Sequence, residues 1–445
     1  MYARPAETLA GTPLATEAQE LIRRCVHCGF CLPACPTYRV TGNELDGPRG
    51  RIYLIKDMLE RGVATATTRA HLDRCLTCRA CESACPSGVQ YGRLVDLGRE
   101  LVETRPPPVP RTTRERLLRA ALRVVVSHRA LFTPLVRVGQ ALRPLLPARM
   151  RVLVPPRLAS VQPDGLAWPA SRHARHMVVL EGCVQPGLAP QVNVAAARVL
   201  DRLGITLVPA RGVGCCGAME HHLGGTETAL ARVKRNVEAS ARLLDAGAEA
   251  IVSTASGCGV FAKDYGHALR HEPRSVRVAA ERVGAATRDL CEILDIEALR
   301  RRWTTAAGDE PPRRALRVAW QAPCSLQHGQ RAATAGKVEA ILRAIGCELV
   351  DVQHPTLCCG SAGTYSILQP ALSRELRERK LASLTAAAPD VIATANVGCL
   401  EHLRQASPVP VRHWIEIVDT ALTRAPAPSP ALRERVGDQR RATTR

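Results

Sequence analysis

Aromatic residues are scarce in this chain of 445 residues, which contains three Phe, four Trp and six Tyr. Leu, Val, Ile and Ala must therefore fill its hydrophobic cores. No uninterrupted apolar run approaches the roughly 20 residues that a membrane-spanning helix needs. Residues 1–24 lack a basic start followed by an apolar stretch, so no signal peptide is evident. We expect a cytoplasmic protein that is soluble or peripheral to the inner membrane.

Motifs for organic cofactors are missing too. No glycine-rich dinucleotide fingerprint follows a predicted strand, and no phosphate-binding loop is visible. Acidic residues are in the minority, because 61 Lys and Arg face 41 Asp and Glu, for a formal net charge of +20. That charge suits an anionic membrane surface or an acidic partner subunit. The chain has no aromatic–basic platform or recognition module, so we expect no nucleic-acid partner.

Cysteine, by contrast, is abundant, and eight of the 18 cysteines form two copies of one pattern. In each copy three cysteines are separated by two residues, and a fourth follows after three more, directly before a proline. The copies are Cys25-x2-Cys28-x2-Cys31-x3-Cys35-Pro36 and Cys75-x2-Cys78-x2-Cys81-x3-Cys85-Pro86. This spacing is typical of proteins with two [4Fe–4S] clusters, in which the fourth cysteine of each run ligates the other cluster. The expected ligand sets are Cys25, Cys28, Cys31 and Cys85 for cluster 1, and Cys75, Cys78, Cys81 and Cys35 for cluster 2.

Two simpler uses of these cysteines fit less well. Zinc needs only four ligands and usually takes them as separated pairs, so two identical runs of four exceed its needs. Disulfide bonds require an oxidising compartment, and nothing at the N-terminus indicates export. The runs therefore predict iron–sulfur clusters.

Proline and arginine mark the boundaries of the chain's expected parts. Residues 1–102 should form a mostly helical domain with two clusters, because residues 51–60 between the runs have helical apolar spacing. Residues 103–175 read as a Pro/Arg-rich linker with amphipathic helices, which either contact a membrane or partner or form a solvated bridge between domains. Residues 425–445 read as a disordered basic tail.

From residue 176 onward the sequence repeats itself, with units at 176–300 and 314–424. Each unit predicts a β-α-β-α-β order and a parallel sheet. Glycines at 204 and 346 should end the first helix of each unit. The predicted strands are 177–180, 205–209, 250–254, 316–320, 348–352 and 391–395, and the predicted helices are 192–203, 227–244, 335–345 and 371–384.

Each repeat also carries four cysteines just past the ends of predicted strands, where open α/β sheets place their ligands. They are Cys183, Cys215, Cys216 and Cys258 in the first repeat, and Cys324, Cys358, Cys359 and Cys399 in the second. We regard these as candidate sites for a further metal or cluster, against the alternative that they are buried structural cysteines. Cys291 and Cys347 have no counterpart in the other repeat. His221 and His222 follow the first cysteine pair and are expected at the surface or behind the site.

Segments between the cysteines resemble a known family. They are Cys25-Val-His-Cys-Gly-Phe-Cys31, residues 43–55, Cys75-Leu-Thr-Cys-Arg-Ala-Cys81, residues 86–96, residues 181–186 and residues 255–260. Over residues 21–418 they resemble the iron–sulfur subunits of bacterial glycolate oxidases, within a broader family with duplicated CCG domains. The resemblance implies an α+β multidomain fold, in which a helical ferredoxin-type domain with two [4Fe–4S] clusters precedes a duplicated α/β cysteine-rich domain.

The resemblance also implies an electron-transfer role and partners. A FAD-containing subunit would oxidise glycolate to glyoxylate, and this chain would pass the electrons to a quinone-type acceptor. The alternatives are the equivalent subunit of a lactate or glycerol-3-phosphate dehydrogenase, or a scaffold whose clusters carry no electrons. One departure matters: Ala255 and Asn396 stand where related proteins have the first cysteine of a CxxC pair. Each repeat thus has four thiols instead of five, which places a noncubane cluster in doubt.

Overall fold

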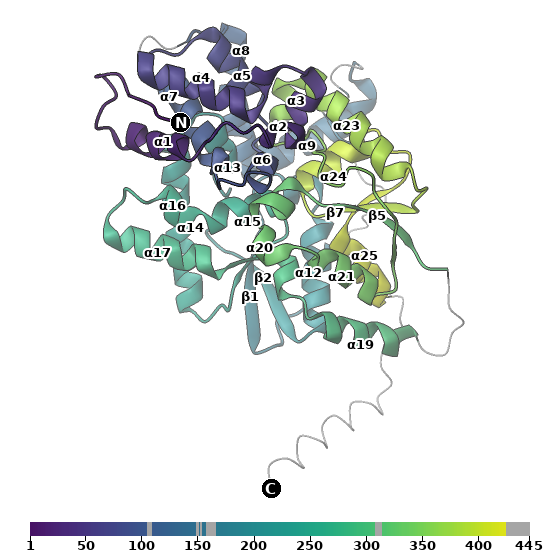
Figure 1. The fold of residues 1–445 in the computed structure, drawn as a ribbon. Coiled ribbons are helices and arrows are strands. Elements are labelled where there is room, and N and C mark those ends of the chain that lie inside the picture. Colours follow the sequence, from purple (N-terminus) through teal and green to yellow (C-terminus); the bar gives the residue numbers. More distant parts are fainter. Residues whose placement is uncertain (105–108, 148–150, 152–153, 157–165, 308–313, 424–445) are drawn as a thin grey trace.

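The computed structural model describes residues 1–104, 109–147, 151, 154–156, 166–307 and 314–423. A helical N-terminal region lies against two successive α/β units (Figure 1). The prolines of residues 105–108, all of residues 157–165 and the tail at 425–445 lie outside the described residues. None of the described helices is both long enough and apolar enough to cross a bilayer.

The N-terminal region is built from short helices around the two cysteine runs. Sequence signals mark both ends of α4, which has Pro48 at its first position and is followed by Gly62, the C-cap residue, whose φ is 70°. Ile55, Leu59 and Leu94 are fully buried in its core. The elements are α1 (Pro13–Arg23), α2 (Cys31–Ala34), α3 (Pro36–Thr41), η1 (Glu44–Asp46), α4 (Pro48–Arg61), α5 (Ala66–Asp73), α6 (Ala80–Ser83) and α7 (Tyr91–Thr104).

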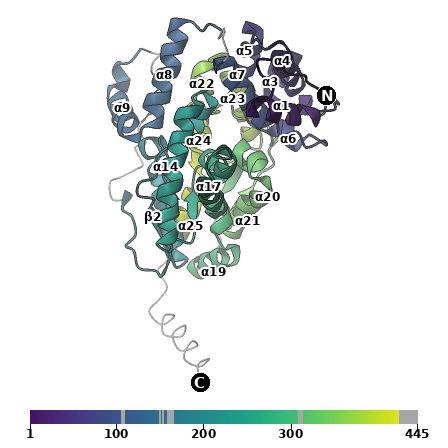
Figure 2. The ribbon, with the colours of Figure 1, turned by 90° about the vertical axis from the view of Figure 1, so that its left-hand side faces the viewer.

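A helical hairpin follows, formed by α8 (Thr113–Ser127) and α9 (Arg129–Leu142) and ending in η2 (Arg143–Leu145). It lies beside α14 at one side of the molecule (Figure 2). The amphipathic helices that the sequence predicts in this segment are therefore present. Much of their apolar surface is exposed: Leu117 is 66% and Leu135 55% accessible.

Both repeats contain a four-stranded parallel sheet of the same topology, with strand orders β2-β1-β3-β4 and β6-β5-β7-β8. The first repeat contains β1 (Arg175–Leu180), α11 (Gln185–Leu188), α12 (Gln191–Arg202), β2 (Ile205–Pro209), α13 (Ala218–His222), α14 (Thr226–Asp245), β3 (Ile251–Ser253), α15 (Ser256–Lys263), α16 (Tyr265–Ala268), α17 (Arg274–Ala286), β4 (Thr287–Asp289), α18 (Leu290–Ile293) and α19 (Ile296–Ala307). The second contains β5 (Arg317–Gln321), η4 (Ser325–Gly329), α20 (Arg331–Thr334), α21 (Lys337–Ala344), β6 (Glu348–Leu349), α22 (Tyr365–Leu368), α23 (Pro370–Thr385), β7 (Val391–Thr394), α24 (Val397–Arg404), β8 (Val411–His413) and α25 (Trp414–Thr423).

The alternation of side chains along β1 divides the hydrophobic residues between two cores. Met177 and Val179 face a core that contains residues of both repeats, whereas Val178 and Leu180 face a second core formed with α14–α17. The shared core joins the repeats, and α12 packs against α25 within it.

Polar contacts reinforce this junction. Arg198 and Arg202 of α12 bind the Asp419 carboxylate of α25 at 2.6 and 2.7 Å. The His413 ring nitrogen Nε2 lies 2.9 Å from the carbonyl oxygen of Thr254 in the other repeat. The N-terminal region contacts both repeats, through Arg93–Asp264 at 3.3 Å and Ser83–His328 at 2.9 Å.

The duplicated parallel architecture confirms the expected fold class, and helices α12 and α21 end before Gly204 and Gly346 as predicted. Two expectations need correction. The strand expected at 348–352 pairs only over Glu348–Leu349, because it lies at a sheet edge where the chain soon leaves β5. Each sheet also has a fourth strand that the sequence did not predict, β4 or β8, because these three-residue strands contain Arg288 or Arg412 and lack an apolar run.

Candidate metal centres

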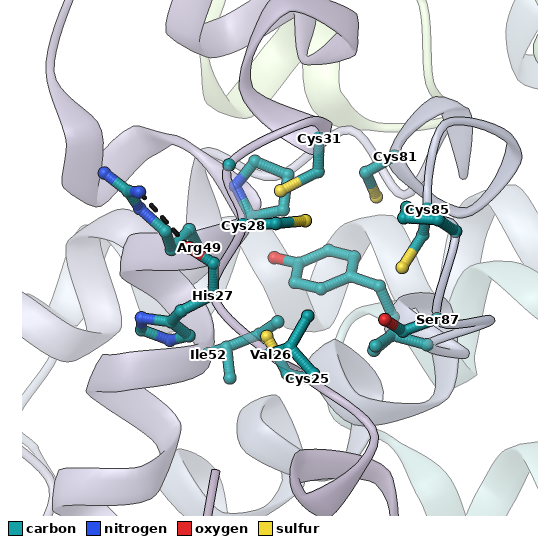
Figure 3. Close-up of a pocket in the computed structure, with 15 residues that line it drawn as sticks. Cys25, Val26, His27, Cys28, Cys31, Arg49, Ile52, Cys81, Cys85 and Ser87 are labelled. Atoms are coloured by element: carbon teal, nitrogen blue, oxygen red, sulfur yellow. Dashed lines mark hydrogen bonds between the residues drawn. The ribbon is translucent and has the colours of Figure 1, made fainter.

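The first cysteine run and the end of the second line one pocket. Its walls include Cys25, Cys28, Cys31 and Cys85, and Cys81 also lines it. Figure 3 shows these sulfur atoms directed toward a common space. Four soft thiol donors around one space suit a cluster with several irons and cysteine ligands. The pocket thus brings together all four residues expected for cluster 1.

The second pocket has the complementary composition. It is lined by Cys75, Cys78 and Cys81 of the second run and by Cys35, the last cysteine of the first run. Cys81 and Tyr91 line both pockets, so the two are direct neighbours. Each pocket therefore combines three cysteines of one run with the fourth of the other, as the crossed ligand pattern requires.

The backbone of the two runs is folded in the same way. His27 and Thr77 occupy equivalent positions and have φ values of 57° and 53°, and Gly29 and Arg79 follow with 86° and 63°. Left-handed conformations are costly for residues other than glycine and persist where surrounding structure enforces them. Their recurrence in both loops shows that the chain bends tightly enough to turn successive cysteines toward one pocket.

Burial disfavours free thiolates in these pockets. It raises the pKa of Cys31 to about 11 and the pKa of Cys35 and Cys81 above the ordinary value. Such thiols become ionised when they coordinate a metal, whose positive charge replaces the lost solvation. The donor set and its burial therefore fit bound iron–sulfur clusters.

A buried polar network supports the second pocket. Arg51 is 1% exposed, and its guanidinium donates to the carbonyl oxygen of His71 at 2.7 Å and to Thr37 Oγ1 at 3.2 Å. The carboxylate of Asp46, which is fully buried, lies 3.7 Å from Arg51 and 2.7 Å from His71 Nδ1. Burial opposes the charge of Arg51, but Cys75 and other neighbouring acidic groups outweigh it and raise its pKa.

Arg99 holds the loop of the second run. Its guanidinium donates to the carbonyl oxygens of Leu72 and Cys75 at 3.0 and 2.7 Å, and to Thr77 Oγ1 at 2.8 Å. No sequence motif marks Arg51, Asp46, His71 or Arg99 as site residues. Arg51 and Asp46 do fall in the 43–55 segment that carries the resemblance, which was the available signal.

The cysteines of each repeat also come together. In the first repeat Cys183 and Cys216 both interact with Cys215 and lower its pKa, and Cys216 also interacts with Cys258. In the second repeat Cys358 contacts Cys324 and Cys359, and the sulfur atoms of Cys359 and Cys399 lie 3.3 Å apart. Each repeat thus presents a thiol tetrad, although no group of three His, Cys, Asp or Glu in the described residues is arranged to hold a single metal ion.

The second tetrad adjoins the second N-terminal pocket. Cys324 and Cys78 both pack against one small apolar cluster, and Cys78, which lines that pocket, raises the pKa of Cys324. Leu76, Cys358 and Tyr365 pack in the same small apolar cluster. Sequence spacing could not predict this contact, because Cys78 and Cys324 lie 246 positions apart and only tertiary packing joins them.

The remaining cysteines and histidines lie apart from these sites. Cys291 is buried in α18, whereas Cys347 is half-buried just before β6. His221 and His222 lie on α13, where both approach the Asp96 carboxylate of α7, with the Nδ1 atom of His222 at 3.1 Å. Asn396, at the position of the missing CxxC cysteine, directs its amide toward Cys399 Sγ at 3.9 Å.

Comparison with known families agrees with this geometry. Residues 21–89 match the 4Fe-4S dicluster domain, and residues 177–262 and 318–404 each match the cysteine-rich domain. The chain is 47% identical over 422 residues to the glycolate oxidase iron-sulfur subunit of Escherichia coli K12, covering 95% of this chain and 99% of that protein.

More distant relatives share parts of the same layout. A probable glycolate oxidase iron-sulfur subunit of Bacillus subtilis is 30% identical over 410 residues, covering 85% of this chain and 88% of the relative. Lactate utilization protein A of Bacillus licheniformis is 23% identical over 243 residues, covering 54% of this chain and 96% of that protein. Together with the two thiol pockets and the duplicated cysteine-rich units, these matches show that the chain belongs to the family of glycolate oxidase iron–sulfur subunits.

Proposed function

We propose that this chain carries electrons within a glycolate:acceptor oxidoreductase, from a FAD-containing subunit that oxidises glycolate to glyoxylate to a quinone-type acceptor. The observation that carries the proposal is the adjacency of the two thiol pockets, which share Cys81 and Tyr91. A [4Fe–4S] cluster takes up and releases one electron at a time. The chain's own contribution is to hold two such groups side by side and to surround them with the charges of Arg49 and Arg51.

The ligand assignment is part of the proposal. Cys25, Cys28, Cys31 and Cys85 would hold one cluster, and Cys75, Cys78, Cys81 and Cys35 the other. The test uses Cys28→Ser and Cys78→Ser in the assembled complex, with Cys291→Ser as the control because Cys291 lies outside both pockets and both tetrads.

Each ligand variant should lose one cluster's electron paramagnetic resonance signal and stop electron delivery to the acceptor. Reduction of the partner's flavin by glycolate should survive, because that step precedes this chain. Unchanged acceptor reduction in both variants would instead favour the alternative of a scaffold. Replacing glycolate by lactate or glycerol 3-phosphate in the flavin assay separates the substrate alternatives.

The tetrads of the repeats are the candidate sites for a further metal or cluster, and the contact of Cys324 with Cys78 supports the second of them. Iron and acid-labile sulfide, measured on anaerobically purified protein, should reach about eight of each per chain for two [4Fe–4S] clusters alone. A higher content that falls in Cys358→Ser would assign the excess to the second tetrad. A content that stays at the two-cluster level would remove metal binding from both tetrads.

We also propose that the α8–α9 hairpin attaches the protein to an anionic membrane surface. Leu131, Leu135, Val138 and Leu142 follow one another at helical spacing on α9, and all are between 45% and 56% exposed. Residues 113–143 contain seven arginines and one acidic residue, Glu115. An exposed apolar stripe with a basic surround is the pattern of a helix that lies in the interface of a bilayer.

Sedimentation with vesicles tests this attachment. The protein should bind vesicles that contain anionic phospholipid, and Leu135→Glu should abolish most of that binding. Val278→Glu is the matched control, because Val278 is similarly exposed (54%) but lies on α17. Equal binding by both variants would show that the hairpin does not contact lipid.

A further inference from the structure

A cavity of about 380 Å³ lies between the N-terminal region and the first repeat. Helices α1 and α7 form one side of it, and α13 to α16 form the other, as their neighbouring positions in Figure 1 indicate. Its volume falls in the range of sites that bind small organic molecules. Neither the two thiol pockets nor the tetrads account for this cavity.

The cavity adjoins the second thiol pocket. Thr77, Arg79 and Gly92 line both spaces, so a single layer of residues separates a molecule in the cavity from the pocket of Cys75 and Cys78. Gly92 contributes no side chain to this layer, and a Cβ atom there would lie 3.0 Å from Glu82 Oε1. A redox-active molecule in the cavity would therefore be a direct neighbour of the second pocket.

The apolar part of the lining suits the faces of a flat ring. Leu97, Leu230, Val260 and Phe261 contribute apolar side chains. The Phe261 ring lies 5.5 Å from the ring of His221 and 6.2 Å from that of His222, measured between centroids. Aromatic and aliphatic walls of this kind stack on rings without requiring charge.

The charged residues of the cavity are largely paired with one another. Glu17 binds Arg270 and lies 3.3 Å from His267, and Asp264 lies 3.3 Å from Arg93. The cavity therefore does not offer a cluster of unpaired arginines, which a phosphate or a polycarboxylate would require. This balance favours an uncharged ligand.

His222 offers a hydrogen-bonding group to the cavity. The Nδ1 atom of His222 lies 3.1 Å from the Asp96 carboxylate, and within the described part of the chain its Nε2 atom has no partner. Burial opposes ionisation of Asp96, but His222, His221 and Arg99 outweigh it and hold the pKa of the carboxyl well below its usual range. A carboxylate at Nδ1 orients the ring, and in the imidazolium form both ring nitrogens are donors, so that Nδ1–H faces Asp96 and Nε2–H can donate to a ligand oxygen.

We infer that this cavity binds the ring of the quinone-type acceptor, with His222 donating to one of its carbonyl oxygens. This inference rests on the proposed function, which supplies the electrons. Reduction converts two C=O groups to two C–OH groups and consumes two electrons and two protons. The electrons cross the Thr77–Arg79–Gly92 layer one at a time, one proton comes from His222 and the other from water, and His222 regains its proton from water.

Photoaffinity labelling of the complex provides a readout independent of turnover. An azido-substituted quinone should label peptides of α13 to α16, and excess unmodified quinone should compete for the label. Leu230→Trp should fill the cavity and abolish labelling, whereas Val278→Trp, at an exposed position of α17 outside the lining, should label normally. Labelling confined to other peptides, or unchanged labelling of Leu230→Trp, would overturn the inference.

Kinetics of the same variants separate this inference from the proposed function. In Leu230→Trp and His222→Gln, glycolate should still reduce the iron–sulfur centres, but quinone should reoxidise them slowly. Loss of a proton donor commonly costs about a hundredfold in rate, and His176→Gln, outside the cavity, is the control. If glycolate fails to reduce the centres in the unmodified complex, the proposed function is wrong. If the centres are reduced and both variants are reoxidised at the normal rate, only the placement of the quinone is wrong.

Discussion

A single buried guanidinium, that of Arg51, connects the packing of the N-terminal region to the charge around the second thiol pocket. It lines that pocket, and it also binds the carbonyl oxygen of His71 and approaches Asp46. Removing one partner of a buried ion pair is costly because the other charge stays buried without compensation. The positive charge should also favour the more negative, reduced state of a cluster held by Cys35 and Cys75.

Arg51→Met should therefore lower the free energy of unfolding by about 3 kcal/mol and shift the reduction potential of one cluster to a more negative value. Arg61→Met is the control on the same helix, since the Arg61 side chain is 70% exposed and pairs with Asp57. That exposed pair should contribute less than about 1 kcal/mol. Thermal unfolding and a redox titration followed by paramagnetic resonance measure the two effects. A normal potential in Arg51→Met would show that Arg51 is structural only.

Single residues also show how far the sequence could predict the site. The eight N-terminal cysteines could be predicted from the sequence because their ligand pattern is local. The structure brings them into two pockets as expected. Arg51 and Arg99 were not predicted, because a buried arginine has no local signature that separates it from an exposed one. Arg51 contacts a residue 20 positions away, and Arg99 contacts residues 22 and 27 positions away, so their roles depend on the fold.

Two glycines in the second repeat give a matched test at the level of its helices and loops. Gly360 and Gly336 both have positive φ values, 85° and 72°. A Cβ atom at Gly360 would lie 2.5 Å from the carbonyl oxygen of Ser373 in α23, whereas nothing lies within 4 Å at Gly336. Only Gly360 is thus required for the close approach of the cysteine loop to a helix.

Gly336→Ala should cost about 1 kcal/mol from backbone strain alone. Gly360→Ala should cost about 2 to 5 kcal/mol, because an overpacked contact adds to the strain. Denaturant unfolding of both variants measures the difference. Equal losses would mean that α23 moves away freely and that the glycine serves only the turn.

The elements themselves were predicted well where hydrophobic patterning is strong. The long helices α14 and α23 lie within one residue of the expected ranges at each end, and β2 coincides with its prediction. The fourth strands were not predicted, because β4 and β8 consist of three residues each and alternate buried and exposed positions too briefly to be recognised. The hairpin α8–α9 was predicted as helical, but its exposed apolar stripe became evident only from the packing.

At the level of the whole molecule, the repeats are joined by a neutral buried histidine. Burial lowers the pKa of His413 to about 4, and its ring links the second repeat to the carbonyl oxygen of Thr254 in the first. In the unfolded chain the same group titrates near 6.5. Between these values the unfolded state binds more protons, so stability decreases as the pH falls from about 6.5 to about 4.

The loss that His413 contributes should approach about 3 kcal/mol at the lower end of this window. His413→Gln should reduce the slope of stability against pH between pH 6.5 and 4. His354→Asn is the control, because His354 is exposed and asparagine tolerates its φ of 52°. Unfolding midpoints measured at several pH values test this, and an unaltered slope in His413→Gln would contradict it.

The arrangement of the parts was the least predictable feature. Sequence repetition predicted two similar units, but the shared core of α12 and α25 and the contact of Cys324 with Cys78 depend on surfaces that the units present to each other. The molecule thus contains the two thiol pockets, the two thiol tetrads and a cavity large enough for a small organic molecule. Such proximity is what an electron-transfer subunit requires.

The most direct test of this account is rapid-freeze paramagnetic resonance of the complete complex, mixed first with glycolate and then with a quinone. The account predicts that glycolate produces the signals of two interacting reduced [4Fe–4S] clusters and that quinone removes them at the rate of turnover. Clusters that keep one oxidation state while glycolate is consumed and quinone is reduced would contradict it.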